Sequence, residues 1–129
     1  MKISIIIPCK NEAGVVEHLL EALVRQSRVA DEIIVVDSHS TDTTVESSQQ
    51  YANKLPLTII KADKPGAAHA RNAGATIATG DMLIFMDADL IPDAEFLADF
   101  EVQVTKHLFA AGSFTQQMKS KKITIRLGA

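Results

Sequence analysis

Short apolar runs alternate with longer amphipathic segments along the first hundred residues. Runs rich in β-branched residues predict strands at 3–7, 33–36, 57–60 and 82–87. Between them apolar residues recur at helical spacing, as they do over residues 15–24. Strands alternating with helices of about ten residues favour parallel pairing, so the pattern predicts a doubly wound α/β fold with a mainly parallel sheet and helices on both faces.

The predicted elements have recognisable ends. The first strand is expected to stop at Pro8, which cannot donate a hydrogen bond to a sheet. Thr43 and Glu46 have capping-box spacing at the start of a second helix. The breaker residues 64–66 precede an alanine-rich helix that is predicted to run to about Ala78, with side chains small enough for close packing on a sheet.

The last predicted helix starts near Pro92 and Asp93, which suit a first helical turn. A further strand is predicted at residues 108–114. The buried stripe of the helix is predicted to consist of Phe96, Leu97, Phe100 and Val104.

Length and charge refine this organisation. A chain of 129 residues with 47% hydrophobic content suits one domain, predicted at residues 1–115. No acid follows Glu101, whereas five Lys or Arg side chains do, so residues 116–129 are interpreted as a basic tail or the start of a missing acceptor half. Such a tail can attract an anionic membrane or the acidic body of its own domain. Few aromatics accompany these charges, so no nucleic acid is expected, while peripheral membrane association or an oligomer stays open.

Cys9 is the one cysteine, which excludes an intramolecular disulfide and a Cys-rich zinc site and suits a reducing compartment. It is expected to be structural rather than reactive. No apolar run approaches the roughly 20 residues that cross a bilayer, and residues 3–7 are too short for a signal peptide. We therefore expect a soluble, unprocessed cytoplasmic protein, with membrane-peripheral attachment left open.

Asp87 and Asp89 follow the apolar run 82–86 directly. In an extended segment alternate side chains share a face, so both carboxylates can converge on one divalent cation. Mg²⁺ or Mn²⁺ suits such oxygen ligands. The alternative is that Asp87 caps the next turn and Asp89 is merely solvated.

Other polar residues also follow predicted strands. In doubly wound sheets ligands bind beyond the carboxyl ends of the strands, so these residues should meet at one crevice. Arg71, with Lys10 and Lys64, offers positive charge to a diphosphate, and a nucleoside diphosphate derivative would suit both the cation and these side chains. The residues predicted at this crevice are Asn11, Glu12, Asp37, Gly66, Asp87 and Asp89.

Four segments in this order resemble a known family over residues 3 to about 97. Residues 5–12 look like its opening strand and Pro-x-x-Asn-Glu turn, and residues 34–42 like its Val-Val-Asp-x-x-Ser-x-Asp segment. Residues 66–74 look like its Ala-Arg-Asn-x-Gly segment, and residues 83–89 like its metal-binding Asp-x-Asp strand. The family is glycosyltransferase family 2, which transfers a sugar from a nucleotide donor, and the resemblance implies a GT-A, Rossmann-like nucleotide-binding half.

The resemblance implies roles at the nucleoside end of a donor of UDP-sugar or GDP-sugar type. Asp37 would hydrogen-bond the base, and the turn that contains Pro8, Asn11 and Glu12 would lie along the nucleoside. Family members often carry an aromatic residue where this chain has Cys9 and Lys10, so the resemblance does not extend to stacking on the base.

At the other end of the donor, the resemblance implies that Arg71 lies near the base or the diphosphate. Asp87 would lie near the ribose and the metal, and Asp89 would be the direct ligand of Mg²⁺ or Mn²⁺. The cation would stabilise the leaving nucleoside diphosphate as the sugar bond breaks.

Family members place an acidic general base after the metal strand, and some add a Gln-x-x-Arg-Trp motif. Here only 40 residues follow Asp89, with no acid after Glu101 and no tryptophan. The catalytic base is therefore not identified, and general-base assistance of roughly 10²- to 10⁴-fold would be lost. The chain is interpreted as a donor-binding half, truncated or completed by something else, that does not finish sugar transfer alone.

Three alternatives remain at this point. The chain could be a non-catalytic nucleotide-sugar-binding module or an inactive remnant. A haloacid-dehalogenase-like phosphatase normally opens with its Asp-x-Asp motif, which here comes late. A response-regulator receiver carries paired acids after its first strand, where this chain has residues 10–12, Lys-Asn-Glu.

Overall fold

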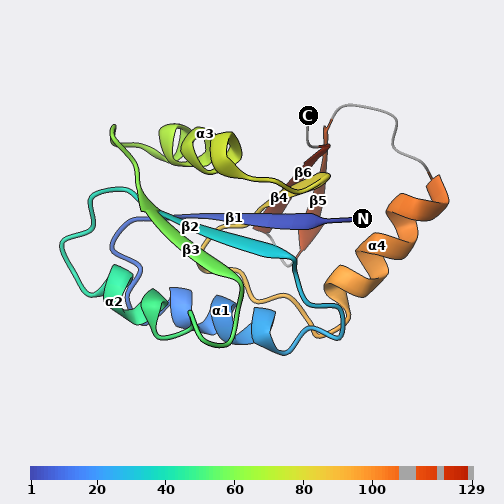
Figure 1. Ribbon diagram of the computed structural model, residues 1–129, viewed down its shortest axis with the longest axis horizontal. Helices are drawn as coiled ribbons and strands as arrows, with labels where there is room; N and C mark the ends of the chain where they lie inside the picture. The colour runs from blue at the N-terminus through green and yellow to red at the C-terminus, as the bar shows by residue number, and fades with distance from the viewer. Residues whose placement is uncertain (108–112, 119–120, 128–129) are drawn as a thin grey trace.

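A computed structural model describes residues 1–107, 113–118 and 121–127, with side chains described as far as residue 106. Helices flank a six-stranded sheet of strand order β3-β2-β1-β4-β6-β5 (Figure 1). The elements are β1 (Ile3–Cys9), α1 (Val16–Val24), β2 (Glu32–Asp37), α2 (Thr44–Gln49), β3 (Leu57–Lys61), α3 (Ala67–Ile77), β4 (Met82–Phe85), α4 (Phe96–His107), β5 (Ser113–Met118) and β6 (Lys121–Leu127).

The sheet is mainly parallel, which confirms the predicted fold class. β1 pairs in parallel with β2 on one side and with β4 on the other. The strand order therefore reverses beside β1, and such a switch point opens a crevice at the carboxyl ends of the two strands. This arrangement places the crevice where the predicted site residues converge.

An antiparallel hairpin of β5 and β6 extends the sheet beyond β4. Of the strand predicted at 108–114, residues 108–112 lie outside the described part of the chain, and β5 begins at Ser113. The hairpin spans the domain boundary expected at residue 115, and that boundary stays a prediction.

The central strands are apolar on both faces, and helices cover both. Ile3, Ile5 and Ile7 pack on the face that carries α1 and α4, whereas Ile6 packs on the opposite face against α3 (Figure 1). Burial on both faces is typical of parallel strands in α/β proteins. The predicted stripe of α4 is confirmed, because all four of its members are buried: Phe96, Leu97, Phe100 and Val104.

The first strand is longer than predicted, since β1 runs through Pro8 to Cys9. The carbonyl of Ile6 accepts a hydrogen bond from the Met86 N–H at 3.0 Å, on the β4 side. Because backbone groups alternate along a strand, the Pro8 nitrogen also faces that side, beyond the last pair of Ile6 with Phe85. The paired part of β1 and β4 has ended at that point, so proline interrupts no pair of that ladder.

Two other predicted boundaries were wrong. β4 ends at Phe85, two residues before Asp87. α4 begins at Phe96 rather than near Pro92, because Asp93 forms a separate turn in which its carbonyl accepts the Phe96 N–H at 3.1 Å.

The capping box predicted for α2 does not form. Thr43 is the N-cap residue, but its side chain makes no capping hydrogen bond. Instead Asp42 Oδ1 accepts the Thr44 N–H at 3.0 Å. Asp42, which precedes the expected cap, therefore pairs the Thr44 N–H, a donor that has no partner within the helix.

α3 lies very close to the sheet because Gly74 faces it. A Cβ atom at this position would lie 2.5 Å from Ile6 Cγ2 and 3.1 Å from Val36 Cγ2. Both of these side chains are fully buried, with 0% exposure. The glycine therefore sets the height of α3 above β1 and β2, and with it the position of Arg71 one turn earlier.

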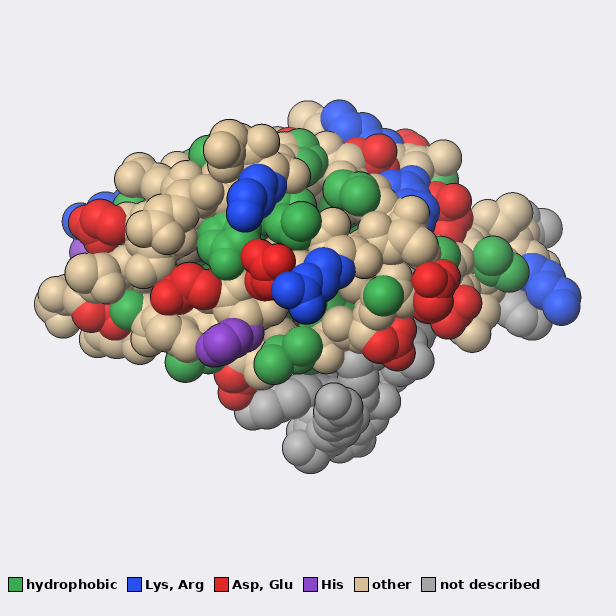
Figure 2. Space-filling view, turned by 90° about the horizontal axis from the view of Figure 1, so that it is seen from below, with side chains coloured by type: hydrophobic (Ala, Val, Ile, Leu, Met, Phe, Trp, Pro, Cys, Tyr) green, Lys and Arg blue, Asp and Glu red, His purple; other side chains and the backbone are tan. Residues whose placement is uncertain are grey.

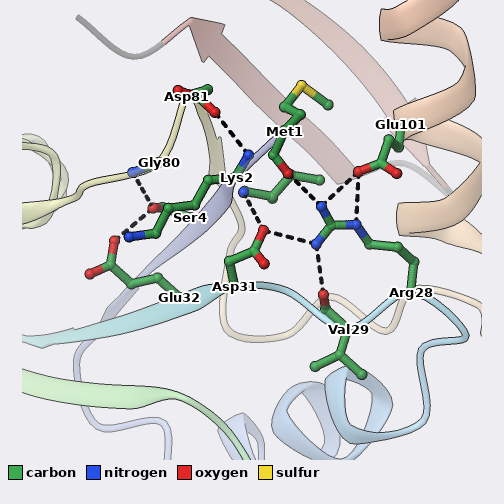
Figure 3. A network of polar contacts seen from close by, with 11 residues as sticks. Met1, Lys2, Ser4, Arg28, Val29, Asp31, Glu32, Gly80, Asp81 and Glu101 are labelled. Carbon is green, nitrogen blue, oxygen red and sulfur yellow. Dashed lines mark hydrogen bonds and ion pairs between the residues drawn. The ribbon is translucent and has the colours of Figure 1, made fainter.

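Arg28 joins distant segments at the amino ends of the strands (Figure 3). Its guanidinium donates to Glu101 Oε2 on α4 at 2.9 and 2.6 Å, and to Asp31 Oδ2 at 2.9 Å. It also donates to the carbonyls of Met1 and Val29, at 2.7 and 2.8 Å. Burial disfavours the charged form, but the hydrogen bonds that Arg28 donates to Glu101 and Asp31, with the charges of these two carboxylates, outweigh burial and raise the pKa of Arg28. We call this the Arg28 network.

A second polar cluster lies beside it. The buried Ser4 hydroxyl donates to Glu32 Oε1 at 2.6 Å and accepts the Gly80 N–H at 2.9 Å (Figure 3). Burial alone would raise the pKa of Glu32, but the hydrogen bonds from Ser4 and Thr79 and the charge of Lys2 hold it below its ordinary value. The carboxylate therefore stays ionised at neutral pH and joins β2 to the segment before β4.

The surface that carries α1 and α2 is mixed in character. Figure 2 shows acidic and basic side chains interspersed there, with hydrophobic side chains in small separate groups. Within the described ranges, no helix has the length and apolarity that crossing a bilayer requires.

Candidate functional site

A cleft of about 410 Å³ opens at the carboxyl ends of β1, β2 and β4, beside the start of α3. Its walls come from residues 8–10 and 12 at and just after the end of β1, Ser38 after β2, residues 66–67 and 70–71 at the start of α3, and residues 87–89 after β4. Four loops therefore meet at one place, as the sequence predicts. Of the predicted site residues, Pro8, Glu12, Arg71, Asp87 and Asp89 line this cleft.

Asp87 and Asp89 reach the cleft from a turn rather than from a strand. The Asp87 carbonyl accepts the Leu90 N–H at 3.1 Å, which closes the turn just after β4. Ala88 and Leu90 are each only 2% exposed. Because these two apolar residues anchor the turn in the core, Asp87 and Asp89 remain on the cleft side. Both residues therefore line the cleft from a turn rather than from the extended segment that the sequence predicts, and their convergence on one cation stays a prediction.

Arg71 lies opposite these carboxylates on α3. Its Nη2 is 3.6 Å from Asp87 Oδ1, and the two side chains are 43% and 48% exposed. An ion pair this open contributes little to stability. The guanidinium is therefore available to an anion that enters the cleft.

The carboxylates suit a cation that takes its other ligands from a bound molecule. Among the described residues, no group of three or more His, Cys, Asp or Glu side chains could hold a metal ion. Mg²⁺ and Mn²⁺ are commonly held by one or two carboxylates plus substrate phosphates, and Asp87 with Asp89 provides that donor set. The residues present therefore fit a shared metal site rather than an all-protein cage.

The charges that line the cleft also suit this arrangement. Lys10 and Arg71 contribute two positive charges, and Glu12, Asp87 and Asp89 contribute three negative ones, for a sum of −1. A divalent cation would change this sum to +1. A bound cation would therefore make the cleft more favourable for an anionic ligand.

Asn11 holds the wall of the cleft rather than lining it. Its backbone is left-handed, with φ of 51°. Its N–H donates to Ser40 Oγ at 2.9 Å, and its Oδ1 accepts the Thr41 N–H at 2.8 Å. The next N–H, of Glu12, donates to Thr44 Oγ1 at 2.9 Å. These bonds join the loop after β1 to the loop after β2 and to the first residue of α2, a role that the sequence motif alone did not indicate.

Gly66 forms another part of the wall, at the start of α3. Its φ of 105° is a conformation that other residues rarely adopt. Lys64, predicted to contribute positive charge, is exposed but does not line the cleft, whereas Lys10 does.

Asp37 and Ser38 are each only 4% exposed at the end of β2. Asp37 Oδ2 accepts the Ser40 N–H at 3.2 Å, but Asp37 Oδ1 and Ser38 Oγ have no hydrogen-bond partner among the described residues. Each such buried group costs about 1–3 kcal/mol unless a ligand or water satisfies it. Ser38 lines the main cleft, and sequence reasoning missed it.

Asp37 does not line the main cleft. It borders a second hollow of about 340 Å³ between α2 and β3. Its side chain lies on the same side of β2 as Val35, which packs on the α1 face, because side chains alternate along a strand. The contact of Asp37 with a nucleotide base stays a prediction.

Cys9 is buried beneath the cleft, with 2% exposure. Burial, with the negative charges of Glu12 and Asp37, raises the pKa of the Cys9 thiol to about 12. The thiol is therefore protonated at neutral pH and is a poor nucleophile, in agreement with the structural role expected of it.

Comparison with known proteins identifies relatives of this fold and site. The family described as Glycosyl transferase family 2 matches residues 4–116. The chain is 38% identical over 89 residues to the uncharacterized glycosyltransferase YibD of Escherichia coli (strain K12), covering 68% of this chain and 26% of that protein. It is 32% identical over 111 residues to the poly(ribitol-phosphate) beta-N-acetylglucosaminyltransferase TarS of Staphylococcus aureus (strain Mu50 / ATCC 700699), covering 83% and 19%.

Two solved structures are similar. Residues 1–349 of S. aureus TarS in complex with UDP-GlcNAc give a TM-score of 0.77 at 30% identity, covering 89% of this chain and 33% of that one. The mannosyltransferase PcManGT from Pyrobaculum calidifontis, in complex with GDP-Man and Mn²⁺, gives 0.74 at 33% identity, covering 80% and 32%. The chain thus spans 19% to 33% of the length of these relatives. Neither the phosphatase nor the receiver alternative gains support from them.

Proposed function

The chain belongs to glycosyl transferase family 2, and from that membership we propose that its cleft binds a nucleoside-diphosphate sugar together with a divalent cation, as the donor for transfer to an acceptor hydroxyl. The observation that carries the proposal is that Asp87, Asp89 and Arg71 line one cleft at the switch point of the sheet. Two carboxylates and a guanidinium suit a cation and a diphosphate side by side.

The diphosphate end of the donor would lie nearest β4. Asp89, assisted by Asp87, would hold Mg²⁺ or Mn²⁺, which neutralises negative charge on the leaving nucleoside diphosphate. Arg71 would donate to a phosphate oxygen, and its weak pairing with Asp87 at 3.6 Å costs little to exchange. Lys10, on the opposite wall, would add positive charge.

The nucleoside end would lie over β1 and β2. Pro8 and Glu12 line that side of the cleft, and Asn11 would act by holding their loop in place. Asp37 borders the second hollow rather than the cleft, so its unpaired Oδ1 would accept a hydrogen bond from a base N–H where the base extends past the end of β2. UDP and GDP donors both remain candidates, since TarS is described with UDP-GlcNAc and PcManGT with GDP-Man and Mn²⁺.

Isothermal titration calorimetry of the purified chain with UDP and GDP tests the proposal. We expect binding of at least one of them with Mn²⁺ present, weakened at least about tenfold when the metal is chelated, because the cleft alone carries a net negative charge. Adenosine diphosphate serves as the comparison nucleotide. If neither UDP nor GDP binds in the presence of Mn²⁺, the proposal is wrong.

We further propose that these 129 residues do not complete sugar transfer. The acids lining the cleft are Glu12, Asp87 and Asp89, and the proposal assigns each of them to the donor. No acid follows Glu101. The proton of an acceptor hydroxyl would then have no assigned base, whose help is worth roughly 10²- to 10⁴-fold.

Incubating the purified chain with UDP-sugar or GDP-sugar, Mn²⁺ and a panel of carbohydrate and polyol acceptors should give no transfer product by mass spectrometry. Nucleotide binding measured on the same preparation shows that the donor site is intact. Rapid product formation by the 129-residue chain would contradict the proposal.

A further inference from the structure

Ser38 is held firmly at the edge of the cleft. It is the first residue after β2, and its N–H donates to the Cys9 carbonyl at 2.8 Å, which fixes its backbone to β1. The residue lines the main cleft yet is only 4% exposed. A side chain in this position can meet a bound molecule but has little access to bulk water.

Its hydroxyl differs from the other buried polar groups in residues 1–106. Ser38 Oγ has no hydrogen-bond partner there, and Asp37 Oδ1 is the other side-chain atom in that state. The remaining buried polar side chains all form hydrogen bonds: Ser4, Gln26, Thr44 and Ser48. A buried hydroxyl left unpaired lowers stability relative to alanine, which indicates that the group serves a bound molecule.

We propose that the Ser38 hydroxyl hydrogen-bonds the nucleoside part of the donor, at the ribose or the base, an inference that rests on the proposed function. The sheet order supplies the reason. Ser38 follows β2 and the Asp87/Asp89 turn follows β4, with β1 between them. Two strand spacings separate them by roughly 10 Å. Phosphates that share a cation with Asp89 lie at the β4 end, so Ser38 reaches the other end of the molecule.

Ser38→Ala tests this assignment through three readouts: nucleotide affinity, pyrophosphate affinity and the melting temperature of the unliganded protein. With Mn²⁺ present, the dissociation constant of the bound nucleotide, UDP or GDP, should rise about three- to tenfold, the usual value of one net hydrogen bond. Binding of inorganic pyrophosphate with Mn²⁺ should not change, because pyrophosphate lacks a nucleoside. The melting temperature of the unliganded protein should stay the same or rise, because the variant removes an unpaired buried hydroxyl.

Ser48→Ala is the matched control. Ser48 is fully buried on α2, and its hydroxyl donates to the Thr44 carbonyl at 2.8 Å. This variant should lower the melting temperature and leave nucleotide affinity unchanged in the folded protein.

Three results would overturn the assignment. Equal nucleotide affinity in the wild type and Ser38→Ala would remove Ser38 from the site and leave the proposed function intact. A lower melting temperature with equal losses for nucleotide and pyrophosphate would show a purely structural role. Absence of nucleotide binding by the wild type would overturn this inference and the proposed function together.

Discussion

Replacing Asp89 with alanine is expected to abolish the manganese-dependent part of nucleotide binding, weakening it by about a hundredfold or more. Losing an outer partner of a metal ligand already costs about 10- to 100-fold in metal affinity, and loss of a direct ligand costs at least as much. Asp87 alone would remain, and Arg71 lies only 3.6 Å from it. The measurement is calorimetric titration of UDP and GDP with and without Mn²⁺.

Asp99→Ala is the matched control for this variant. Asp99 is an exposed acid in the first turn of α4 and does not line the cleft. Its replacement removes the same charge as Asp89→Ala, and nucleotide binding should be unaffected. Thermal unfolding of both variants shows whether the fold is retained. Unchanged manganese dependence in folded Asp89→Ala would remove Asp89 from the metal site.

Replacing Gly74 with alanine is expected to lower the free energy of unfolding by about 1–3 kcal/mol, the usual cost of adding a methyl group to a packed interface. Helix propensity alone would favour alanine by about 1 kcal/mol, so a loss would show that packing dominates. The added Cβ would lie 2.5 Å from Ile6 Cγ2. Relief of this steric clash requires α3 to move away from the sheet. That movement would displace Arg71 and weaken nucleotide binding as well.

Chemical denaturation and calorimetry on the same variants test this prediction. Thr76→Ala changes an exposed residue of the same helix and should be neutral or slightly stabilising. In the double variant Ile6→Ala/Gly74→Ala, the free energy of unfolding should fall by at least about 0.5 kcal/mol less than the sum of the two single-variant losses. The smaller side chain at position 6 leaves space for the added Cβ at position 74. Gly74→Ala with wild-type stability and affinity would contradict the close packing.

The fold was predictable because its strands and helices follow the spacing of apolar residues. The runs at 3–7 and 33–36 are buried on both sides, and few alternatives to a central parallel strand fit them. The ends of the strands and helices were less predictable because they depend on contacts with neighbouring elements. Pro8 lies within β1 because it still pairs with Val36 of β2, beyond the last pair with β4, and no local pattern contains that information.

The candidate site was predictable in its loops and less so in its geometry. Asp87 and Asp89 share a cleft, but they reach it from a turn anchored by Ala88 and Leu90 rather than from a strand. Asp37 was expected beside them, yet the alternation of side chains along β2 places it on the other face. Ser38 could have been found from that alternation, since it follows Val36 on the α3 side.

The Arg28 network joins Met1, the loop before β2 and α4 at the amino edge of the sheet, whereas the cleft lies at the carboxyl edge. These cross-links therefore hold the fold together without depending on the binding loops. Over evolutionary time, loops placed in this way can change sequence and length at little cost to folding. Variation in ligand preference among homologous chains would then concentrate at the carboxyl edge, while exchanges at the amino edge would be selected mainly for folding.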